Sequence, residues 1–216
     1  IPGGCATSFC RGRFEFEVAL HQLSGMGTDA QPGTLRLMLG SLGVMDDLTF
    51  VEMPDLYNVA MPDGFSLALK TRKEEVLAAL KGRFPHESGA VDEFFDLVYR
   101  YANEFLAAFY FKDPEASREK YPTLYTHAFK PAAEVLDRIS NDPLLKALVS
   151  VYWGYLGLPP TRLSFAYIAM LFFTYLEFKP FHLKGGSQAL SNAIVNRFVS
   201  NGGTVRYSCA VKQILL

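Results

Sequence analysis

The sequence lacks the residue patterns that mark several common classes of protein. It holds only 3 cysteines in 216 residues, with no CxxC pair and no Cys/His ligand spacing, which argues against a disulfide framework or a metal site. No basic run stands out among 21 basic and 22 acidic residues, so nucleic-acid binding has no electrostatic support. No basic-then-apolar signal sequence opens the chain. These absences favour a cytoplasmic protein with reduced thiols.

The chain also has no GxGxxG motif and no Walker loop, so it offers no complete phosphate cradle. What it does have is two glycine pairs, Gly3-Gly4 and Gly185-Gly186. Paired glycines let the backbone approach a ligand closely, and a following helix points its N–H groups at an anion. Each pair taken alone also fits an ordinary turn. The chain opens at Ile1 without a preceding strand and stops inside an apolar run, so we expect a piece of a longer polypeptide.

Apolar and aromatic residues are plentiful, at 50% and 14% of the chain. They indicate a large core, and some of the rings are candidates for the lining of an apolar cavity or for contact with a membrane. Residues 163–178 are the most apolar stretch, about 16 residues against the roughly 20 needed to span a bilayer. A buried helix, a helix on a membrane surface and a roof over an apolar pocket all fit this stretch.

Alternating and helical periodicities predict an α+β fold. We expect a mixed, largely antiparallel sheet, helices over one face of it, and a remnant of a nucleotide-binding α/β layer. The predicted half-buried strand at 13–21 places Phe14, Phe16, Val18 and Leu20 on its apolar face, and Arg13, Glu15 and Glu17 on the opposite, polar face. Further strands are predicted at 50–61, 65–69 and 204–214, and helices at 33–43, 73–111, 132–178 and 188–200.

The two ends of the chain carry a more specific pattern. The opening reads PGGCATSFCRGRFEFEVALHQLSG and the close reads FHLKGGSQALSNAIVNRFVSNGGTVRYSCAVKQIL. Both resemble the phytoene desaturase, carotenoid isomerase and retinol saturase family of FAD-dependent oxidoreductases. The middle is similar more loosely, through KEEVLAALKGRFPHESGAVDEFF. His21, in FEVALHQLSG, brings the chain nearer to the retinol saturases.

The resemblance implies an FAD cofactor whose main dinucleotide-binding motif precedes this chain. It implies that Gly3 and Gly4 lie beside the phosphate and ribityl region, and that Gly185 and Gly186 lie near the flavin. It also implies that the backbone at Val211 lies against the adenine. Residues 1–30 would then form the edge of the FAD site, 31–180 the substrate-binding domain and 181–216 a returning segment of the FAD domain. Ala19 departs from the family, which usually has Gly there.

Candidate residues for chemistry and substrate binding are few. His21 suits a proton donor beside a flavin because its pKa range lies near working pH, although a structural histidine also fits. Phe172, Phe173, Tyr175 and Phe178 are candidates for the wall of a substrate pocket, with core packing as the alternative. No spacing of histidines indicates a metal.

We therefore expect the parent protein to be an FAD-dependent desaturase, saturase or isomerase acting on double bonds of a hydrophobic, carotenoid-like or retinoid-like substrate. This chain alone is expected to be inactive and to bind no FAD. A lipid-binding or interaction module without redox activity, and a flavoenzyme of the amine-oxidase type, stay open as alternatives. Expected partners are the substrate and the absent segments of the parent chain. Unpaired strand edges and the apolar helix also favour a homodimer or contact with a membrane surface.

Overall fold

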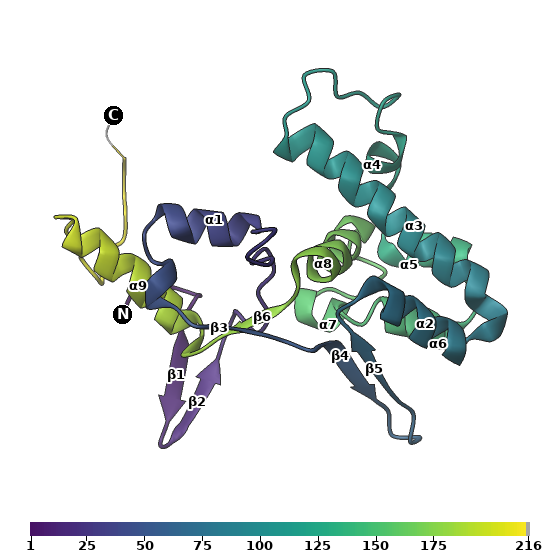
Figure 1. The fold of residues 1–216 in the computed structure, drawn as a ribbon, viewed down its shortest axis with the longest axis horizontal. Coiled ribbons are helices and arrows are strands. Elements are labelled where there is room, and N and C mark those ends of the chain that lie inside the picture. The colour runs from purple at the N-terminus through teal and green to yellow at the C-terminus, as the bar shows by residue number, and fades with distance from the viewer. Residues whose placement is uncertain (215–216) are drawn as a thin grey trace. The chain divides into compact units, whose positions relative to one another are not determined.

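The computed structural model describes residues 1–214 and divides the chain into two compact units (Figure 1). Unit 1 combines Ile1–Met53 with the chain from Phe178 onward, and unit 2 is Pro54–Glu177. The segment 31–53, which the sequence groups with the substrate domain, therefore lies in the same unit as both ends of the chain. The functions predicted for residues 1–30, 31–180 and 181–216, as FAD-site edge, substrate-binding domain and returning FAD segment, stay predictions.

Unit 1 is built from two short sheets and two main helices. Strand β1 (Ser8–Arg11) pairs with β2 (Phe14–Glu17), and β3 (Phe50–Glu52) pairs with β6 (Phe181–Leu183). The helices are α1 (Thr34–Ser41) and α9 (Gly186–Ser200), with a 3₁₀ turn at Met45–Asp47. A small core joins β6 to both helices through Met26, Leu39, Val44, Phe181 and Ala193.

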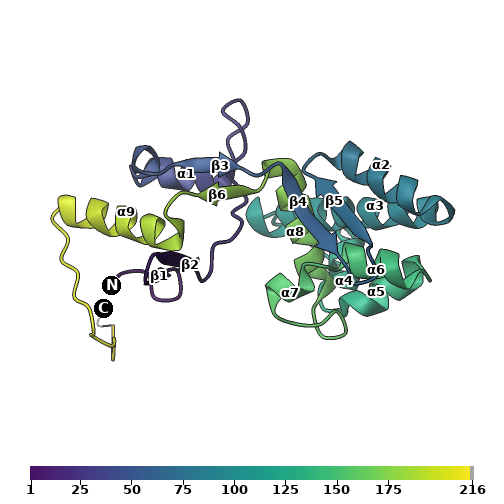
Figure 2. The ribbon, with the colours of Figure 1, turned by 90° about the horizontal axis from the view of Figure 1, so that it is seen from below.

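Unit 2 is mostly helical. Strands β4 (Asp55–Ala60) and β5 (Ser66–Lys70) form a hairpin next to α2, and α8 lies among the other helices (Figures 1 and 2). The helices are α2 (Lys73–Arg83), α3 (Ser88–Phe105), α4 (Pro122–His127), α5 (Ala132–Ile139), α6 (Pro143–Val149), α7 (Trp153–Leu156) and α8 (Phe165–Phe178). A 3₁₀ turn at Pro85–Glu87 precedes α3, and a π-helical turn at Leu106–Tyr110 follows it.

Aromatic packing between α3 and α8 forms the centre of unit 2. Phe172 is fully buried, with its ring centroid 5.6 Å from that of Phe94 and 5.8 Å from that of Phe95, both in edge-to-face geometry. Aromatic pairs of this geometry add stabilisation beyond the area they bury. The hydroxyls of Tyr57 and Tyr152 connect the hairpin to the helices by donating to Leu148 O (2.8 Å) and Leu56 O (3.2 Å). The buried residues of α3, among them Phe94, Phe95 and Val98, thus form its core face.

The α+β class is confirmed, and every named strand pair is antiparallel. The strands form three separate two-stranded sheets. The predicted stretch at 50–61 is divided between two of them, because β3 pairs with β6 whereas β4 pairs with β5. The helical range predicted at 132–178 is divided into several helices, of which α6 begins directly after Asp142. Asp142 Oδ1 accepts from Leu144 N (2.8 Å) and Leu145 N (2.9 Å) and so satisfies the first turn of α6.

Two strand predictions require correction. Residues 204–214 form no strand, since no other strand of the described chain lies beside them to accept and donate hydrogen bonds. Val211, placed on that strand by the sequence, is 81% exposed. The strand predicted at 13–21 is shortened to Phe14–Glu17. Of its expected apolar face, Phe14, Phe16 and Val18 are exposed, because no other layer covers that face within unit 1, whereas Leu20 is half-buried.

Helix α8 contains the most apolar stretch of the sequence, yet it extends over only 14 residues. In residues 1–214, no helix has both the length and the apolar character required to cross a bilayer. Seven of its side chains are buried, so packing within the protein accounts for much of its apolar character.

Candidate functional site

The first glycine pair lies against the N-terminal half of α9. A side chain at Gly3 would collide with Ala6 O and with Ser191 Oγ, and its φ of 107° disfavours any L residue. Ser191 Oγ donates to Ala6 O (2.7 Å), and Gln188 Nε2 donates to Pro2 O (3.3 Å). The loop at Gly3 is therefore fastened to α9 by side chains of the helix.

The second glycine pair forms the start of α9. Gly185 is the N-cap with φ 78°, and Gly186 follows with φ 61°. A Cβ at Gly186 would collide with Glu17 Oε2 at the end of β2. Both glycine pairs thus lie around one half of one helix, and the β1–β2 hairpin meets the helix at its first turn (Figure 1).

Glu17 organises this junction. Its Oε2 accepts from Ser187 N (2.6 Å), and its Oε1 accepts from Ser187 Oγ and from Val18 N (2.9 Å), Ala19 N (2.9 Å) and Leu20 N (3.1 Å). Burial raises the pKa of Glu17, but the hydrogen bonds from Ser187 Oγ and from backbone N–H groups outweigh burial and lower the pKa to about 2. Glu17 is therefore ionised at neutral pH and neutralises the positive end of α9.

The residues at this junction do not suit the diphosphate of a dinucleotide. A cavity of about 180 Å³ beside the junction is lined by Ser8, Glu15, Glu17, His182 and the second glycine pair. Two carboxylates in its wall repel a diphosphate, and Glu17 already occupies the helix N-terminus that would attract one. This junction consequently forms no diphosphate site. Gly4 differs from Gly3 and Gly186, because a Cβ built there meets nothing within 4 Å, and its backbone is exposed.

His21 and Val211, the other residues predicted to lie near FAD, do not line the cavities described for this chain. His21 is exposed and directly follows Leu20, whose N–H donates to Ser187 Oγ (3.1 Å), so it stands near the start of α9. Val211 lies in the irregular stretch after α9 and is exposed to solvent. The functions predicted for His21, Val211 and the glycines stay predictions.

A large apolar cavity of about 810 Å³ lies in unit 2 between α3, α4 and α8. No charged side chain is among the residues that line it. These are Tyr101, Phe105, Phe109, Leu124, Tyr125, Ala128, Phe129, Leu156, Ser164, Ala166, Tyr167, Met170, Leu171 and Thr174. Its size falls in the range of small-molecule sites, and its lining suits a long apolar ligand.

The end of α3 widens into a π-helical turn at this cavity. The turn spans Leu106–Tyr110, and Phe105 and Phe109 at its start and within it both line the cavity. Single π-helical turns inside α-helices occur frequently at functional sites. The sequence predicted one continuous helix to residue 111 and gave no sign of this turn.

Phe172, Phe173, Tyr175 and Phe178, which the sequence predicted as a pocket wall, are not among the residues that line the 810 Å³ cavity. Phe172, Phe173 and Tyr175 are buried, and Phe173 packs on Tyr99 with ring centroids 5.3 Å apart. None of the three is among the residues that line the 810 Å³ cavity. The carbonyl of Phe178 accepts from Gly27 N (3.0 Å) in unit 1. The cavity is faced instead by Ala166, Tyr167, Met170, Leu171 and Thr174, a second stripe at helical spacing that the sequence analysis did not single out.

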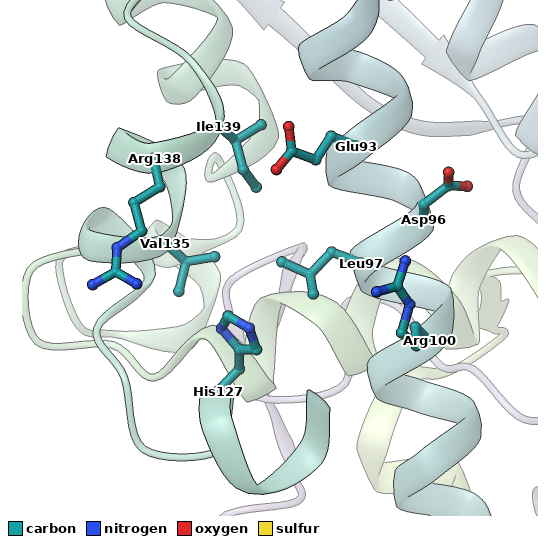
Figure 3. A pocket seen from close by; sticks show the side chains of 8 residues that line it. All are labelled: Glu93, Asp96, Leu97, Arg100, His127, Val135, Arg138 and Ile139. Atoms are coloured by element: carbon teal, nitrogen blue, oxygen red, sulfur yellow. The ribbon is translucent and has the colours of Figure 1, made fainter. Parts of the chain in front are cut away.

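A second cavity in unit 2, of about 440 Å³, has mixed charge (Figure 3). The ring of His127 points into the space between α3 and α5, with Arg100 and Arg138 on either side and Glu93 farther away (Figure 3). Burial lowers the pKa of His127, and Lys130 and Arg138 lower it further, so the imidazole is neutral at pH 7. Its Nδ1 is buried and has no hydrogen-bond partner in the described chain. Within residues 1–214, no group of three or more His, Cys, Asp or Glu side chains is arranged to hold a metal ion.

Comparison with known proteins gives a distant similarity along nearly the whole chain. No protein-family model matches the sequence. The chain is 22% identical over 225 residues to all-trans-retinol 13,14-reductase of Rattus norvegicus, and 22% identical over 235 residues to the protein of that name from Macaca fascicularis. Each match covers 99% of this chain. The chain spans 37% of the length of these two relatives.

Proposed function

We propose that this chain is the substrate-binding portion of an FAD-dependent oxidoreductase that acts on double bonds of a hydrophobic, polyene-like substrate. The observation that carries the proposal is the 810 Å³ cavity of unit 2, whose lining has no charged side chain. The distant similarity to retinol reductases supports the same class of reaction, because the matched region includes the residues that form this cavity.

The cavity suits a substrate with long apolar surface and few polar groups. A polyene there is held mainly by removal of its surface from water, at roughly 25 cal/mol per Å² before ordering costs. Phe105, Phe109 and Tyr101 offer aromatic faces to a conjugated chain. Exclusion of water from such a cavity also protects reactive intermediates from side reactions.

The cofactor proposed for the parent protein is FAD, which transfers hydride to or from the substrate. Unit 1 contributes an edge of that site through the exposed backbone of Gly4 and Gly185, while the junction at Glu17 holds the two glycine pairs in place. His21 is the side chain of this edge suited to move a proton. The diphosphate of FAD is bound by other parts of the parent protein, because Glu17 occupies the start of α9.

A lipid-binding or interaction module without redox activity is the second candidate. The carboxylates at the start of α9, which disfavour a diphosphate there, favour this candidate, and a lipid would occupy the same apolar cavity. An amine oxidase is less favoured, because a protonated amine in this cavity would meet no carboxylate among the lining residues.

The mouth of the cavity suits contact with a lipid surface. Phe129 is 95% exposed and Phe109 and Tyr167 are more than half exposed, although all three line the cavity. Exposed aromatic residues around an apolar cavity allow a hydrophobic substrate to pass from lipid into the protein without crossing water. On the β1–β2 hairpin, the exposed face of Phe9, Phe14 and Phe16 is suited to a further segment of the parent chain or to a second copy.

Two measurements test the proposal. The 216-residue chain should bind a conjugated octadecatetraene alcohol and enhance its fluorescence, with Phe105→Asp abolishing the enhancement and exposed Phe111→Asp preserving it. The full-length parent should be yellow with an absorbance spectrum of bound flavin, whereas this chain alone should be colourless. A colourless parent that still binds the tetraene would support the lipid-binding module instead.

A further inference from the structure

Tyr101 combines burial with an unused hydroxyl. Its side chain, on α3, is only 2% exposed, and its ring packs edge-to-face on Phe165 with centroids 6.1 Å apart. The residue lines the 810 Å³ cavity. None of the hydrogen bonds of the described chain involves its hydroxyl, although the buried hydroxyls of Tyr57 and Tyr152 each donate to a backbone carbonyl.

The other polar side chains of the cavity are engaged or stand in solvent. Ser164 Oγ donates to Ala128 O (2.5 Å), and Thr174 Oγ1 donates to Leu171 O (3.2 Å). Tyr125 and Tyr167 are 38% and 61% exposed, so water is available to their hydroxyls. Tyr101 therefore supplies an unengaged hydroxyl, on an otherwise buried side chain, that a ligand in the cavity is able to engage.

On this basis we infer that Tyr101 is the specificity-determining residue of the cavity and donates a hydrogen bond to a neutral oxygen of the substrate, an alcohol or a carbonyl. The inference rests on the proposed function and deepens it. A hydrocarbon polyene leaves the hydroxyl unpaired when it displaces water from the cavity, which costs binding free energy. A carboxylate would accept the same hydrogen bond but would remain an unpaired charge, since no Lys, Arg or His lines the cavity.

Burial also fixes the protonation state of this group. It raises the pKa of Tyr101 above the ordinary tyrosine value, so the phenol remains a hydrogen-bond donor throughout the physiological range. The preference for a neutral oxygen should consequently be independent of pH between about 6 and 9.

The experiment uses three probes with the same conjugated octadecatetraene chain, ending as the alcohol, the hydrocarbon and the carboxylate. Their dissociation constants for the 216-residue chain are measured by polyene fluorescence. The alcohol should bind about tenfold more tightly than the hydrocarbon and the carboxylate. Tyr101→Phe should weaken binding of the alcohol to the level of the hydrocarbon and leave the hydrocarbon affinity unchanged or improved. Tyr110→Phe, which removes an exposed hydroxyl that does not line the cavity, should preserve the tenfold preference.

The outcomes separate this inference from the proposed function. Equal binding of alcohol and hydrocarbon by the unaltered chain, or a preference that survives Tyr101→Phe, would overturn the inference alone. Failure of all three probes to bind would overturn the proposed function as well. Circular dichroism and thermal unfolding of Tyr101→Phe establish that the variant is folded, and Tyr101→Trp offers a second variant without a hydroxyl if the first does not fold.

Discussion

At the scale of single residues, the carboxylate of Glu17 connects β2, on which it lies, to the segment that follows β2 and to the start of α9. It accepts from the backbone that follows β2 and from both the backbone and the hydroxyl of Ser187 in α9. The sequence placed Glu17 on the polar side of an alternating strand, where nothing indicated a partner near residue 187. Gly3 and Gly186 were singled out for ligand contact, whereas in the structure the space of their missing side chains is filled by Ser191 and Glu17. Glycine pairs are recognisable from sequence, but the atoms that approach them are not.

Replacing Glu17 by Gln should destabilise the chain in a pH-dependent way. Its pKa is about 2 in the folded chain, against an ordinary value of 4.5 for a glutamate. Because the folded pKa is depressed, the stabilisation is fully present above pH 4.5 and is lost as pH falls toward 2. After allowance for solvent screening, we expect about 1–2 kcal/mol at pH 7. Urea unfolding from pH 7 down to pH 2 should show a smaller loss of stability with acid for Glu17→Gln than for the unaltered chain.

The matched control is Glu15→Gln on the same hairpin. Glu15 accepts from Ser8 Oγ (2.7 Å) but receives no hydrogen bond from α9. Its replacement should change the free energy of unfolding by less than about 0.5 kcal/mol. Equal urea midpoints for Glu17→Gln and the unaltered chain at pH 7 would refute a stabilising junction.

At the scale of elements, α8 has two apolar faces with different tasks. Phe172 lies on the face that packs on α3, and Met170 lies on the face that lines the cavity. Helical periodicity predicted α8 but did not separate these faces, because both are apolar and nearly all of its residues fit a core. The pocket was predicted on the face with Phe172, Phe173 and Tyr175 because those residues are aromatic, whereas the cavity is lined by the opposite stripe, which includes Tyr167, Met170 and Leu171.

The two faces should respond differently to truncation. Phe172→Ala removes a fully buried ring and should lower the free energy of unfolding by about 3–5 kcal/mol. Met170→Ala, at a half-buried position, should cost at most about 1–2 kcal/mol but weaken binding of the octadecatetraene alcohol several-fold. Urea unfolding and fluorescence titration of both variants test this. A large loss of stability with unchanged affinity in Met170→Ala would assign this face to the core as well.

The strands show that alternation of apolar and polar residues alone does not predict whether a strand forms. The pattern at 204–214 is as regular as that of β4, yet only β4 has a partner, β5, joined to it by the turn at Met61–Gly64. A strand needs a neighbour for its backbone hydrogen bonds, and a single-chain pattern does not reveal whether that neighbour exists. Strand β1 was missed for the opposite reason, because its four residues are too short for a periodic signal and are set by pairing with β2.

At the scale of the whole molecule, one unit is formed by two separate segments of the chain and the other by a single segment. Unit 1 is assembled from two segments far apart in sequence, whereas unit 2 is the single stretch Pro54–Glu177. Composition and motifs at the chain ends led to a predicted boundary at residue 30. The pairing of β3 with β6, which holds residues 50–52 to the returning segment, was not visible in the sequence.

Unit 2 should therefore fold and bind ligand without unit 1. A fragment of residues 54–177 contains the buried rings of α3 and α8 and all the residues that line the 810 Å³ cavity. It should give a helical circular dichroism spectrum, unfold cooperatively and bind the octadecatetraene alcohol within about threefold of the affinity of the 216-residue chain, since the cavity wall is complete.

A fragment of residues 73–177 is the control. It lacks the hairpin whose Tyr57 hydroxyl bonds Leu148 O and whose Leu56 O accepts from Tyr152, so both partners lose a buried hydrogen bond and Leu56 and Leu69 leave the core. This shorter fragment should lose cooperative unfolding. Non-cooperative unfolding of the 54–177 fragment would mean that unit 2 depends on the rest of the chain for its fold.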